Sequence, residues 1–403
     1  MKITFVSNYI NHHQIPLSEY LYGQLGEDYR FVQTEPMDEE RRMMGWGEGA
    51  GTLPWLICSY EQPEAVRQLI DGSDVVIFGG CEQEELIHQR LCDKKPVLRY
   101  SERIYKEGQW RFITPRGLIR KYHDHIRFRR GPAYLLCAGA YVASDYHLIH
   151  AYPGKMLRFG YFTRLIRYED CHAKRADHKV PVIMWAGRFM DLKHPADALE
   201  VAADLKNEGF SFTLLMAGGG EREQELKNLA HEKELDDIVQ FTGFMKPEQV
   251  REHMERADIF LFTSDHREGW GAVLNEAMNS GCAVAANEAA GASPYLINDG
   301  ENGYLYPNGN VAYLKECVRK LLADPALRRR MGSRAYETIH DVWNPQRAAV
   351  GLLSLCRQII ERTADGRRAP GAGELMLPAE GPCSPAPLIH PGLWNGRHLK
   401  QKS

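Results

Sequence analysis

Short apolar runs of three to five residues recur along the first half of the chain and alternate with longer stretches whose apolar residues are spaced as on one helix face. The runs predict buried strands at Ile3–Val6, Val75–Phe78, Pro96–Leu98 and Ala133–Cys137, and the stretches predict helices that include Gln14–Leu25 and Gln83–Cys92. This alternation is typical of βα units around a parallel sheet.

The alternation is more regular after residue 180. The predicted strands there are Val182–Ala186, Phe212–Ala217, Val239–Phe241, Ile259–Phe262 and Cys282–Ala285, and the helices between them are His194–Asn207, Glu221–Lys233, Glu248–Arg256 and Ala272–Asn279. Strands and helices in this order predict a doubly wound α/β domain.

Polar segments set the expected domain limits. Residues 167–179 are charged and helix-poor, which predicts a linker between an N-terminal domain at 1–166 and a second domain at 180–344. Apolar positions at helical spacing predict a terminal helix at 345–362. Residues 364–403 contain six prolines and six glycines, which predicts a disordered tail, and the glycine-rich residues 38–52 predict a mobile loop.

Composition and charge exclude several classes of protein. A chain of 403 residues is long enough for two or three domains, and 50 Lys and Arg against 53 Asp and Glu do not favour nucleic-acid binding. The nine cysteines form no C-x-x-C pair, so no zinc site or disulfide framework is indicated. Neither a signal peptide nor a membrane-spanning run is evident, and a cytoplasmic enzyme is expected.

Glycines and charged residues follow three of the predicted strands. They are Gly187-Arg188 with Lys193, then Gly218-Gly219-Gly220, and then Glu268-Gly269-Trp270-Gly271. The N-terminus of a helix offers unpaired backbone N–H groups to phosphate, and ligands of doubly wound folds bind at the carboxyl ends of the strands. Arg188 and Lys193 could together neutralise a diphosphate without a metal, or they could be two solvated surface cations. The three glycines alone could be a tight turn.

Two glutamates lie eight residues apart in the run EGWGAVLNEAMNSGCAV. Glu268 comes before the predicted helix, where a carboxylate could accept hydrogen bonds from sugar hydroxyls, and Glu276 lies inside it, where it could bind the hydroxyls of a ribose. The alternative is a capping glutamate followed by a solvated one.

These motifs together resemble the retaining glycosyltransferases of family 4, within glycosyl transferases group 1. The resemblance rests on GRFMDLK, MAGGGE, FTGF, EGWGAVLNEAMNSGCAV and DGENGYLYP. It implies the GT-B architecture, in which two Rossmann-like doubly wound domains face a central cleft and a C-terminal helix crosses back to the first domain. It also implies transfer of a sugar from a nucleotide-sugar bound by the second domain to an acceptor presented by the first, without a cofactor or metal.

The resemblance assigns a role to individual residues. Arg188 and Lys193 would contact the donor diphosphate, Glu268 the donor sugar and Glu276 the ribose. The other residues placed at the donor are Gly219, Phe244, Gly269, Trp270 and Gly271. The chain departs from the family where a glycine pair is commonly followed by Pro-Glu, since it reads Gly291-Ala292-Ser293-Pro294-Tyr295.

Candidates for the acceptor side lie in the first half. His12 and His13 follow the first predicted strand, where they could bind the acceptor or relay a proton, or simply begin a helix. Glu102 and Arg103 follow the strand Pro96–Leu98 and are further candidates.

A basic cluster between residues 111 and 130 holds seven Lys and Arg residues against the single acid Asp124. It could bind an anionic membrane surface or be an ordinary solvated face. The first reading favours a lipid-linked saccharide as acceptor over a soluble saccharide. The expected function is sugar transfer in the assembly of cell-surface polysaccharide or glycolipid. The alternatives are a non-hydrolysing nucleotide-sugar epimerase and a non-catalytic subunit that binds the nucleotide-sugar.

Overall fold

The computed structural model describes residues 1–38, 53–175, 180–364 and 367–391. The chain divides into two compact units. Unit 1 consists of Met1–Arg164 together with Trp343–Ser403, and unit 2 consists of Leu165–Val342. The predicted loop at 38–52 lies outside the described residues, apart from Asp38.

Unit 1 is built on a parallel sheet of seven described strands in the order β3-β2-β1-β4-β5-β6-β7. In chain order these are β1 (Ile3–Ser7), β2 (Tyr29–Gln33), β3 (Leu56–Cys58), β4 (Val75–Phe78), β5 (Val97–Ser101), β6 (Ala133–Ala138) and β7 (Met156–Phe159). The helices between them are α1 (Ile15–Leu25), α3 (Pro63–Gly72), α4 (Glu85–Cys92), α5 (Pro115–Asp124) and α6 (Val142–Leu148). The central strands are apolar on both faces because helices cover the sheet on both sides.

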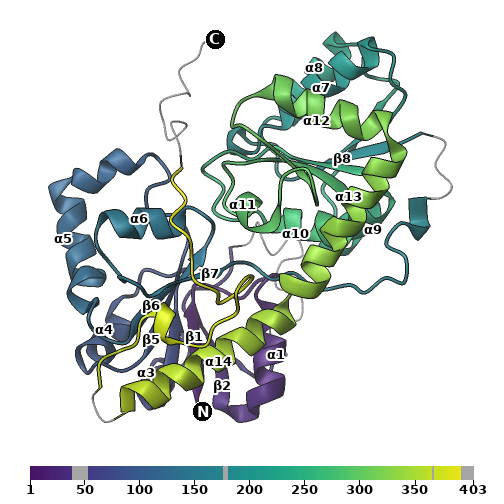
Figure 1. Cartoon of the computed structure of the whole chain (residues 1–403). Helices are drawn as coiled ribbons and strands as arrows, with labels where there is room; N and C mark the ends of the chain where they lie inside the picture. Colours follow the sequence, from purple (N-terminus) through teal and green to yellow (C-terminus); the bar gives the residue numbers. More distant parts are fainter. Residues whose placement is uncertain (39–52, 176–179, 365–366, 392–403) are drawn as a thin grey trace. The chain divides into compact units, whose positions relative to one another are not determined.

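Unit 2 repeats this plan with six described strands in the order β10-β9-β8-β11-β12-β13. The strands are β8 (Val182–Ala186), β9 (Thr213–Ala217), β10 (Val239–Gly243), β11 (Ile259–Phe262), β12 (Ala283–Asn287) and β13 (Tyr304–Tyr306). The helices are α7 (Pro195–Asn207), α8 (Glu223–Glu232), α9 (Pro247–Arg256), α10 (Ala272–Asn279), α11 (Ser293–Leu296), α12 (Val311–Ala323) and α13 (Pro325–Glu337). Figure 1 shows α7, α8 and α12 on one side of this sheet, and α9 and α10 on the other.

The strand order in unit 2 reverses direction between β8 and β11, since the chain moves outward from β8 through β9 to β10 and then returns to β11. Loops that leave the carboxyl ends of two such neighbouring strands turn to opposite sides of the sheet. This point is where the ligand of a doubly wound fold binds.

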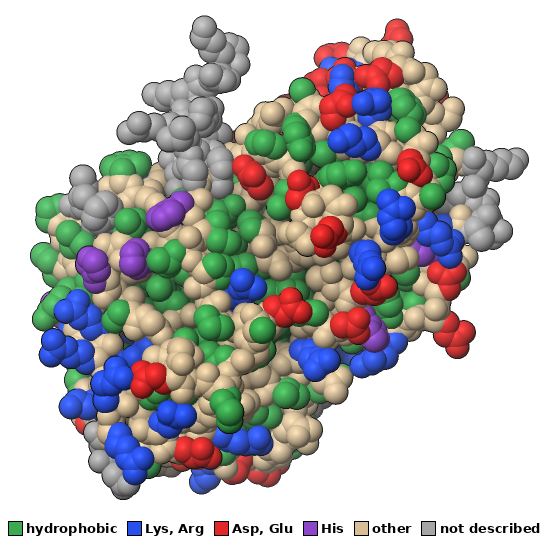
Figure 2. All heavy atoms as spheres, viewed as in Figure 1, with side chains coloured by type: hydrophobic (Ala, Val, Ile, Leu, Met, Phe, Trp, Pro, Cys, Tyr) green, Lys and Arg blue, Asp and Glu red, His purple; other side chains and the backbone are tan. Residues whose placement is uncertain are grey.

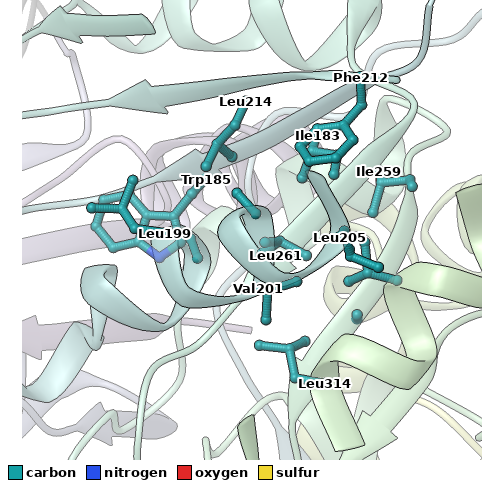
Figure 3. Close-up of a cluster of buried hydrophobic side chains, with 14 of the residues drawn as sticks. Ile183, Trp185, Leu199, Val201, Leu205, Phe212, Leu214, Ile259, Leu261 and Leu314 are labelled. Atoms are coloured by element: carbon teal, nitrogen blue, oxygen red, sulfur yellow. The ribbon is translucent and has the colours of Figure 1, made fainter. Parts of the chain in front are cut away.

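The core of unit 2 lies between the sheet and α7. Leu199, Val201 and Leu205 of α7 are buried against Ile183, Leu214 and Leu261 of the strands (Figure 3). Pro195 and the buried alanines of α7 let the helix begin at the end of β8 and pack closely on the sheet. The core therefore fixes the position of the loop that joins β8 to α7.

The terminal helix is observed as α14 (Pro345–Thr363). It belongs to unit 1 and packs against α1 (Figure 1). Ala348, Leu352, Leu355 and Ile359, which carry the predicted periodicity, are all buried. The expectation that this helix returns to the first domain is confirmed.

The expectation of a disordered tail after Ala364 is wrong for residues 367–391. Backbone groups of this segment pair with β7: Arg158 N donates to Ser384 O at 2.7 Å and Cys383 N donates to Arg158 O at 2.8 Å. Cys383 is fully buried, and the Tyr134 hydroxyl donates to the carbonyl of Pro370 at 2.7 Å. Proline and glycine prevent helix formation here, but an extended segment can still cover the edge of a sheet.

The linker predicted at 167–179 is also corrected, because its described part belongs to unit 2. Arg175 is buried and donates to the carbonyls of Ser280 and Gly281 at 2.6 Å and 2.7 Å. A charged segment suits an exposed linker, but these charges satisfy the carbonyls at the end of α10 instead. Residues 176–179 lie outside the described part of the chain.

Candidate functional site

Lys193 and Glu268 meet at the point in unit 2 where the strand order reverses. Lys193 lies on the loop after β8 and Glu268 on the loop after β11, and Lys193 Nζ donates to Glu268 Oε2. Both side chains are partly buried, at 18% and 16% exposure. The pair holds both side chains close to the carboxyl ends of two adjacent strands.

The backbone at Lys193 is tied to the core below it. Trp185 of β8 is buried and its Nε1 donates to Thr263 Oγ1 at 2.8 Å. Thr263 Oγ1 in turn donates to the carbonyl oxygen of Lys193 at 2.6 Å. This chain of hydrogen bonds joins the ends of β8 and β11 and fixes where the Lys193 side chain starts.

Asp265 forms a second link between the same two loops. Its buried carboxylate lies 3.1 Å from Nε2 of His194 and accepts hydrogen bonds from the Arg267 guanidinium, the shorter at 2.8 Å. Burial alone would raise the pKa of Asp265, but the hydrogen bonds from His194 and Arg267 outweigh it and lower that pKa to about 2. Asp265 is therefore ionised at neutral pH.

Glu268 is held by its backbone at the entrance to α10. Its N–H donates to the carbonyl of Asp265 at 3.0 Å, and its own carbonyl accepts from Gly291 N at 3.2 Å. Gly269 and Trp270 follow it, and both are buried. Trp270 Nε1 donates to Asn275 Oδ1 at 2.8 Å, which anchors the indole against α10.

Gly271 caps the start of α10 with a φ of 94°, a conformation that favours glycine. A Cβ at this position would lie 2.2 Å from Cζ of Phe262, at the end of β11. The chain therefore needs glycine here to bring the N-terminus of the helix next to the strand end. The unpaired N–H groups of α10 give this edge a partial positive charge.

Arg188 and Glu276 are placed without partners among the described residues. The Arg188 side chain is exposed, and no hydrogen bond or ion pair joins it to any other part of the chain that the structure describes. The Glu276 carboxylate, on the second turn of α10, is half-buried and likewise makes no such contact within the described residues. A cation and a carboxylate in this state are available to a ligand.

Gly219 and Phe244 lie together beyond β9 and β10. A Cβ on Gly219 would approach Cε2 of the Phe244 ring to 2.8 Å, so the ring lies directly beside the glycine. Phe244 is 58% exposed, which is unusual for a large apolar side chain. The backbone N–H of Phe189 donates to Gly219 O at 2.8 Å, which ties this loop to the one after β8.

Three of the four acceptor-side candidates form one cluster in unit 1. The His13 ring stacks on Tyr161 at 4.1 Å, and His12 packs edge-on against His13 at 5.1 Å. The Tyr161 hydroxyl donates to Glu102 Oε1 at 2.5 Å, while Lys106 Nζ donates to Glu102 Oε2 at 2.6 Å. Burial, with the neighbouring His12, lowers the pKa of His13 well below its ordinary value, so this imidazole is neutral.

Arg103 points away from this cluster into unit 1. Its guanidinium forms a two-point ion pair with the fully buried Asp145, at 3.1 Å from Nε and 2.9 Å from Nη2. Gln109 Nε2 and the backbone N–H of Tyr105 donate to the same carboxylate. In this arrangement Arg103 orders the loop after β5 rather than facing solvent.

The sequence pattern did not single out Tyr161, His194 or Asp265. Tyr161 follows β7, whose four residues, MLRF, are too short a segment to stand out in the sequence, although a residue two positions beyond a strand end is a reasonable candidate. Asp265 comes three residues after the predicted strand Ile259–Phe262, so its position near the end of the strand could be predicted from the sequence. Its pairing with His194 depends on the order of strands, which the sequence does not state.

The described residues offer neither a set of metal ligands nor a membrane-spanning helix. No group of three or more His, Cys, Asp and Glu side chains in this part of the chain is arranged to hold a metal ion. Within the same residues, no helix has the length and apolar character needed to cross a bilayer.

Part of the chain is similar to a known family of proteins. Residues 168–338 match the family model described as glycosyl transferases group 1. The α-D-kanosaminyltransferase of Streptomyces kanamyceticus is 29% identical over 173 residues, and the lipopolysaccharide core biosynthesis glycosyltransferase LpsE of Rhizobium meliloti is 29% identical over 159 residues. These matches cover 41% and 40% of this chain, and 44% of each relative, so the chain is matched to less than half the length of those proteins.

The similarity in fold covers more of the chain than the matched residues 168–338. The crystal structure of HepE from Anabaena in complex with UDP superposes with a TM-score of 0.64 at 16% identity, over 90% of this chain and 99% of that protein. The chain therefore has the GT-B fold of two Rossmann-like domains, and its residues 168–338 match the family model of glycosyl transferases group 1.

Proposed function

We propose that this chain is a retaining glycosyltransferase of family 4 that moves a sugar from a nucleotide-sugar donor to a saccharide or lipid-linked saccharide. The product would be a cell-surface polysaccharide or glycolipid. The observation that carries the proposal is the Lys193–Glu268 pair, held where the order of strands reverses in unit 2, with an available Arg188 on the same loop as Lys193.

The charges of this site suit a nucleoside diphosphate as leaving group. The Lys193 ammonium has three N–H donors, so it can contact a phosphate oxygen while it keeps its bond to Glu268. The Arg188 guanidinium adds a permanent positive charge with no partner among the described residues. Together with the N–H groups at the start of α10, they would stabilise the negative charge that develops on the diphosphate as it departs.

The carboxylates would bind the rest of the donor. Glu268 accepts hydrogen bonds only, and sugar hydroxyls are donors, so the carboxylate beside Lys193 would orient the transferred sugar. Glu276, which has no partner in the described part of the chain, would accept from the ribose hydroxyls. The exposed ring of Phe244 against Gly219 offers a flat apolar surface to the base.

The reaction would proceed with the acceptor hydroxyl attacking on the face from which the diphosphate leaves. The bond between the anomeric carbon and the diphosphate oxygen breaks, the bond to the acceptor oxygen forms, and the acceptor proton passes to the departing phosphate. The cations and backbone groups already balance the charge on the phosphates, so we propose that no metal is needed. The cluster of His12, His13, Glu102 and Tyr161 would bind acceptor hydroxyls in unit 1.

The experiment that tests this function is a screen of nucleotide-sugars with and without saccharide acceptors. We expect nucleoside diphosphate and a glycosylated product in which the anomeric configuration of the donor sugar is kept. Conversion of the donor to its epimer without acceptor would instead identify an epimerase. Tight donor binding with neither product would identify a non-catalytic binding subunit. Either of these outcomes would contradict the proposal.

A further inference from the structure

Helix α5 of unit 1 carries its apolar side chains on the outside. Leu118, Ile119 and Tyr122 are 36%, 61% and 53% exposed, and no residue of the helix is buried. At 3.6 residues per turn, these three positions share one face of the helix. A helix of a globular unit normally packs its apolar face against the core. An apolar face that points outward indicates a surface that binds another molecule or a membrane.

The opposite side of α5 is the one that contacts the rest of unit 1. Arg99 Nη2 donates to the carbonyl of Asp124 at 2.7 Å, at the end of the helix. Asp124 also forms an ion pair with Arg120 at 3.6 Å, and at 3.6 residues per turn both positions lie on the side of the helix away from Leu118, Ile119 and Tyr122. The helix is therefore attached by polar groups, and its apolar stripe points away from the fold.

Cations border this stripe. Arg116 is exposed and lies next to it on the helix, and Trp110, 60% exposed, comes just before with the guanidinium of the exposed Arg111 over its ring at 5.6 Å. Figure 2 shows hydrophobic and Lys or Arg side chains next to one another over α5. We call this surface, formed by Trp110, Arg111, Arg116, Leu118, Ile119 and Tyr122, the α5 face.

The combination of charge and apolar area identifies the partner. A nucleic acid or an acidic protein would satisfy the cations, but it would leave the exposed isoleucine, leucine and aromatic rings in contact with water. The surface of an anionic bilayer offers phosphates to the arginines and an apolar layer just below them. Trp and Tyr are stable at such an interface because each has an apolar ring with one polar end. We propose that the α5 face binds the surface of an anionic lipid bilayer.

This surface is linked to the acceptor-side cluster through one carboxylate. Asp145 accepts from Gln109, next to Trp110, at 2.8 Å and from Arg103, next to Glu102, at 2.9 Å. Such a connection would suit an acceptor held in a membrane. The binding itself does not depend on the proposed reaction, because it requires neither donor nor acceptor.

The charge part of the proposal is tested by sedimentation with phosphatidylcholine vesicles that contain or lack phosphatidylglycerol. The parent chain should bind only the anionic vesicles. Arg111→Ser with Arg116→Ser should weaken binding about ten- to thirty-fold, since each surface cation contributes about 1 kcal/mol. The control, Arg256→Ser with Arg330→Ser in unit 2, makes the same change in charge at exposed positions and should bind as the parent does. Equal loss in both variants, or no binding by the parent, would overturn the proposal.

The apolar residues of the α5 face provide a test that distinguishes a bilayer from other anionic partners. Ile119→Ser with Tyr122→Ser should remove most binding that persists at high salt, where charge attraction is screened. Val350→Ser with Met376→Ser, two exposed apolar residues elsewhere in unit 1, should have no effect. If the Ile119 and Tyr122 variant keeps parental binding at every salt concentration, the α5 face is a polyanion site and the lipid assignment is wrong. Unchanged far-ultraviolet circular dichroism verifies that each variant is folded.

Discussion

Glu268 and Glu276 lie in different surroundings, and their expected kinetic roles differ accordingly. Glu268 is paired with Lys193, and in the proposed donor complex it would contact the sugar that is transferred. Glu276 would contact the ribose, which does not change during the reaction. A contact that is equal in the ground and transition states affects KM, whereas a contact that strengthens in the transition state affects kcat.

We therefore predict that Glu276→Gln raises the donor KM and that Glu268→Gln lowers kcat. Each effect should be about ten- to a hundred-fold, as expected for loss of a charge-assisted hydrogen bond of about 1.5–3 kcal/mol. Glu232→Gln, at an exposed position of α8, is the control. Steady-state kinetics in which either variant matches this control would remove that glutamate from the donor site.

His194 predicts a pH dependence of stability. Burial lowers its pKa, but the hydrogen bond to Asp265 and the charges of Asp197 and Asp265 outweigh burial and raise it. A histidine whose folded pKa is above its unfolded value of about 6.5 adds stability that is complete below that pH and is lost as the pH rises through the folded pKa. His194→Asn keeps a residue that tolerates the left-handed backbone at φ 46°.

The melting temperature of the parent should therefore exceed that of His194→Asn by more at pH 6 than at pH 8.5. A difference that stays constant across this range, or that increases toward alkaline pH, would show that His194 is not held in its charged form by Asp265.

At the scale of elements, the start of α10 is set by Gly271. Gly271→Ala should destabilise unit 2 by about 1–3 kcal/mol more than Gly209→Ala, because both positions have positive φ but only a Cβ at Gly271 meets another atom, Cζ of Phe262. Thermal melts of the two variants measure the difference, about 2–4 °C for each kcal/mol. Equal melting temperatures would mean that α10 does not need this close approach to β11.

The tail gives a second test at this scale. Truncation after Ala364 removes the backbone bonds to β7 and the burial of Cys383, and should cost about 2–4 kcal/mol. Truncation after Pro391 keeps every described contact of the segment and is the control. A melting temperature that is the same for the two truncations would contradict the packing of residues 367–391 on unit 1.

The apolar pattern predicts many of the longer elements well, but it misses β3, β7 and β13 at the sheet edges and also the interior strand β2. Strands Val182–Ala186 and Ile259–Phe262 and helix Ala272–Asn279 are observed with the predicted bounds, because each is a continuous buried or amphipathic segment. β7 and β13 lie at the edges of their sheets. Less of the chain covers an edge strand than a central one, so the run of apolar residues that marks it in the sequence is short. The order of residues 367–391 depends on pairing with β7, a contact far away in the sequence.

For the whole molecule, the sequence indicates which strand ends carry chemistry, and the fold decides which of them meet. Lys193 and Glu268 are 75 positions apart and become neighbours only because β8 and β11 are adjacent. Arg103 shows the opposite outcome. It follows a strand as a binding residue would, yet Asp145 on a distant helix holds it inside unit 1. Whether a side chain can bind a ligand depends on the partner that it has in the fold, and its position after a strand does not decide this.

The most direct test of the account measures release of nucleoside diphosphate from the donor in excess chelator, for the parent chain and for Lys193→Ala. If Lys193, Arg188 and the start of α10 stabilise the leaving group, the parent keeps full activity without metal. Lys193→Ala should then lose about a hundred-fold or more in kcat, as expected when an electrostatic contact to the transition state is removed. Loss of parental activity that manganese or magnesium restores, or parental activity in Lys193→Ala, would contradict the account.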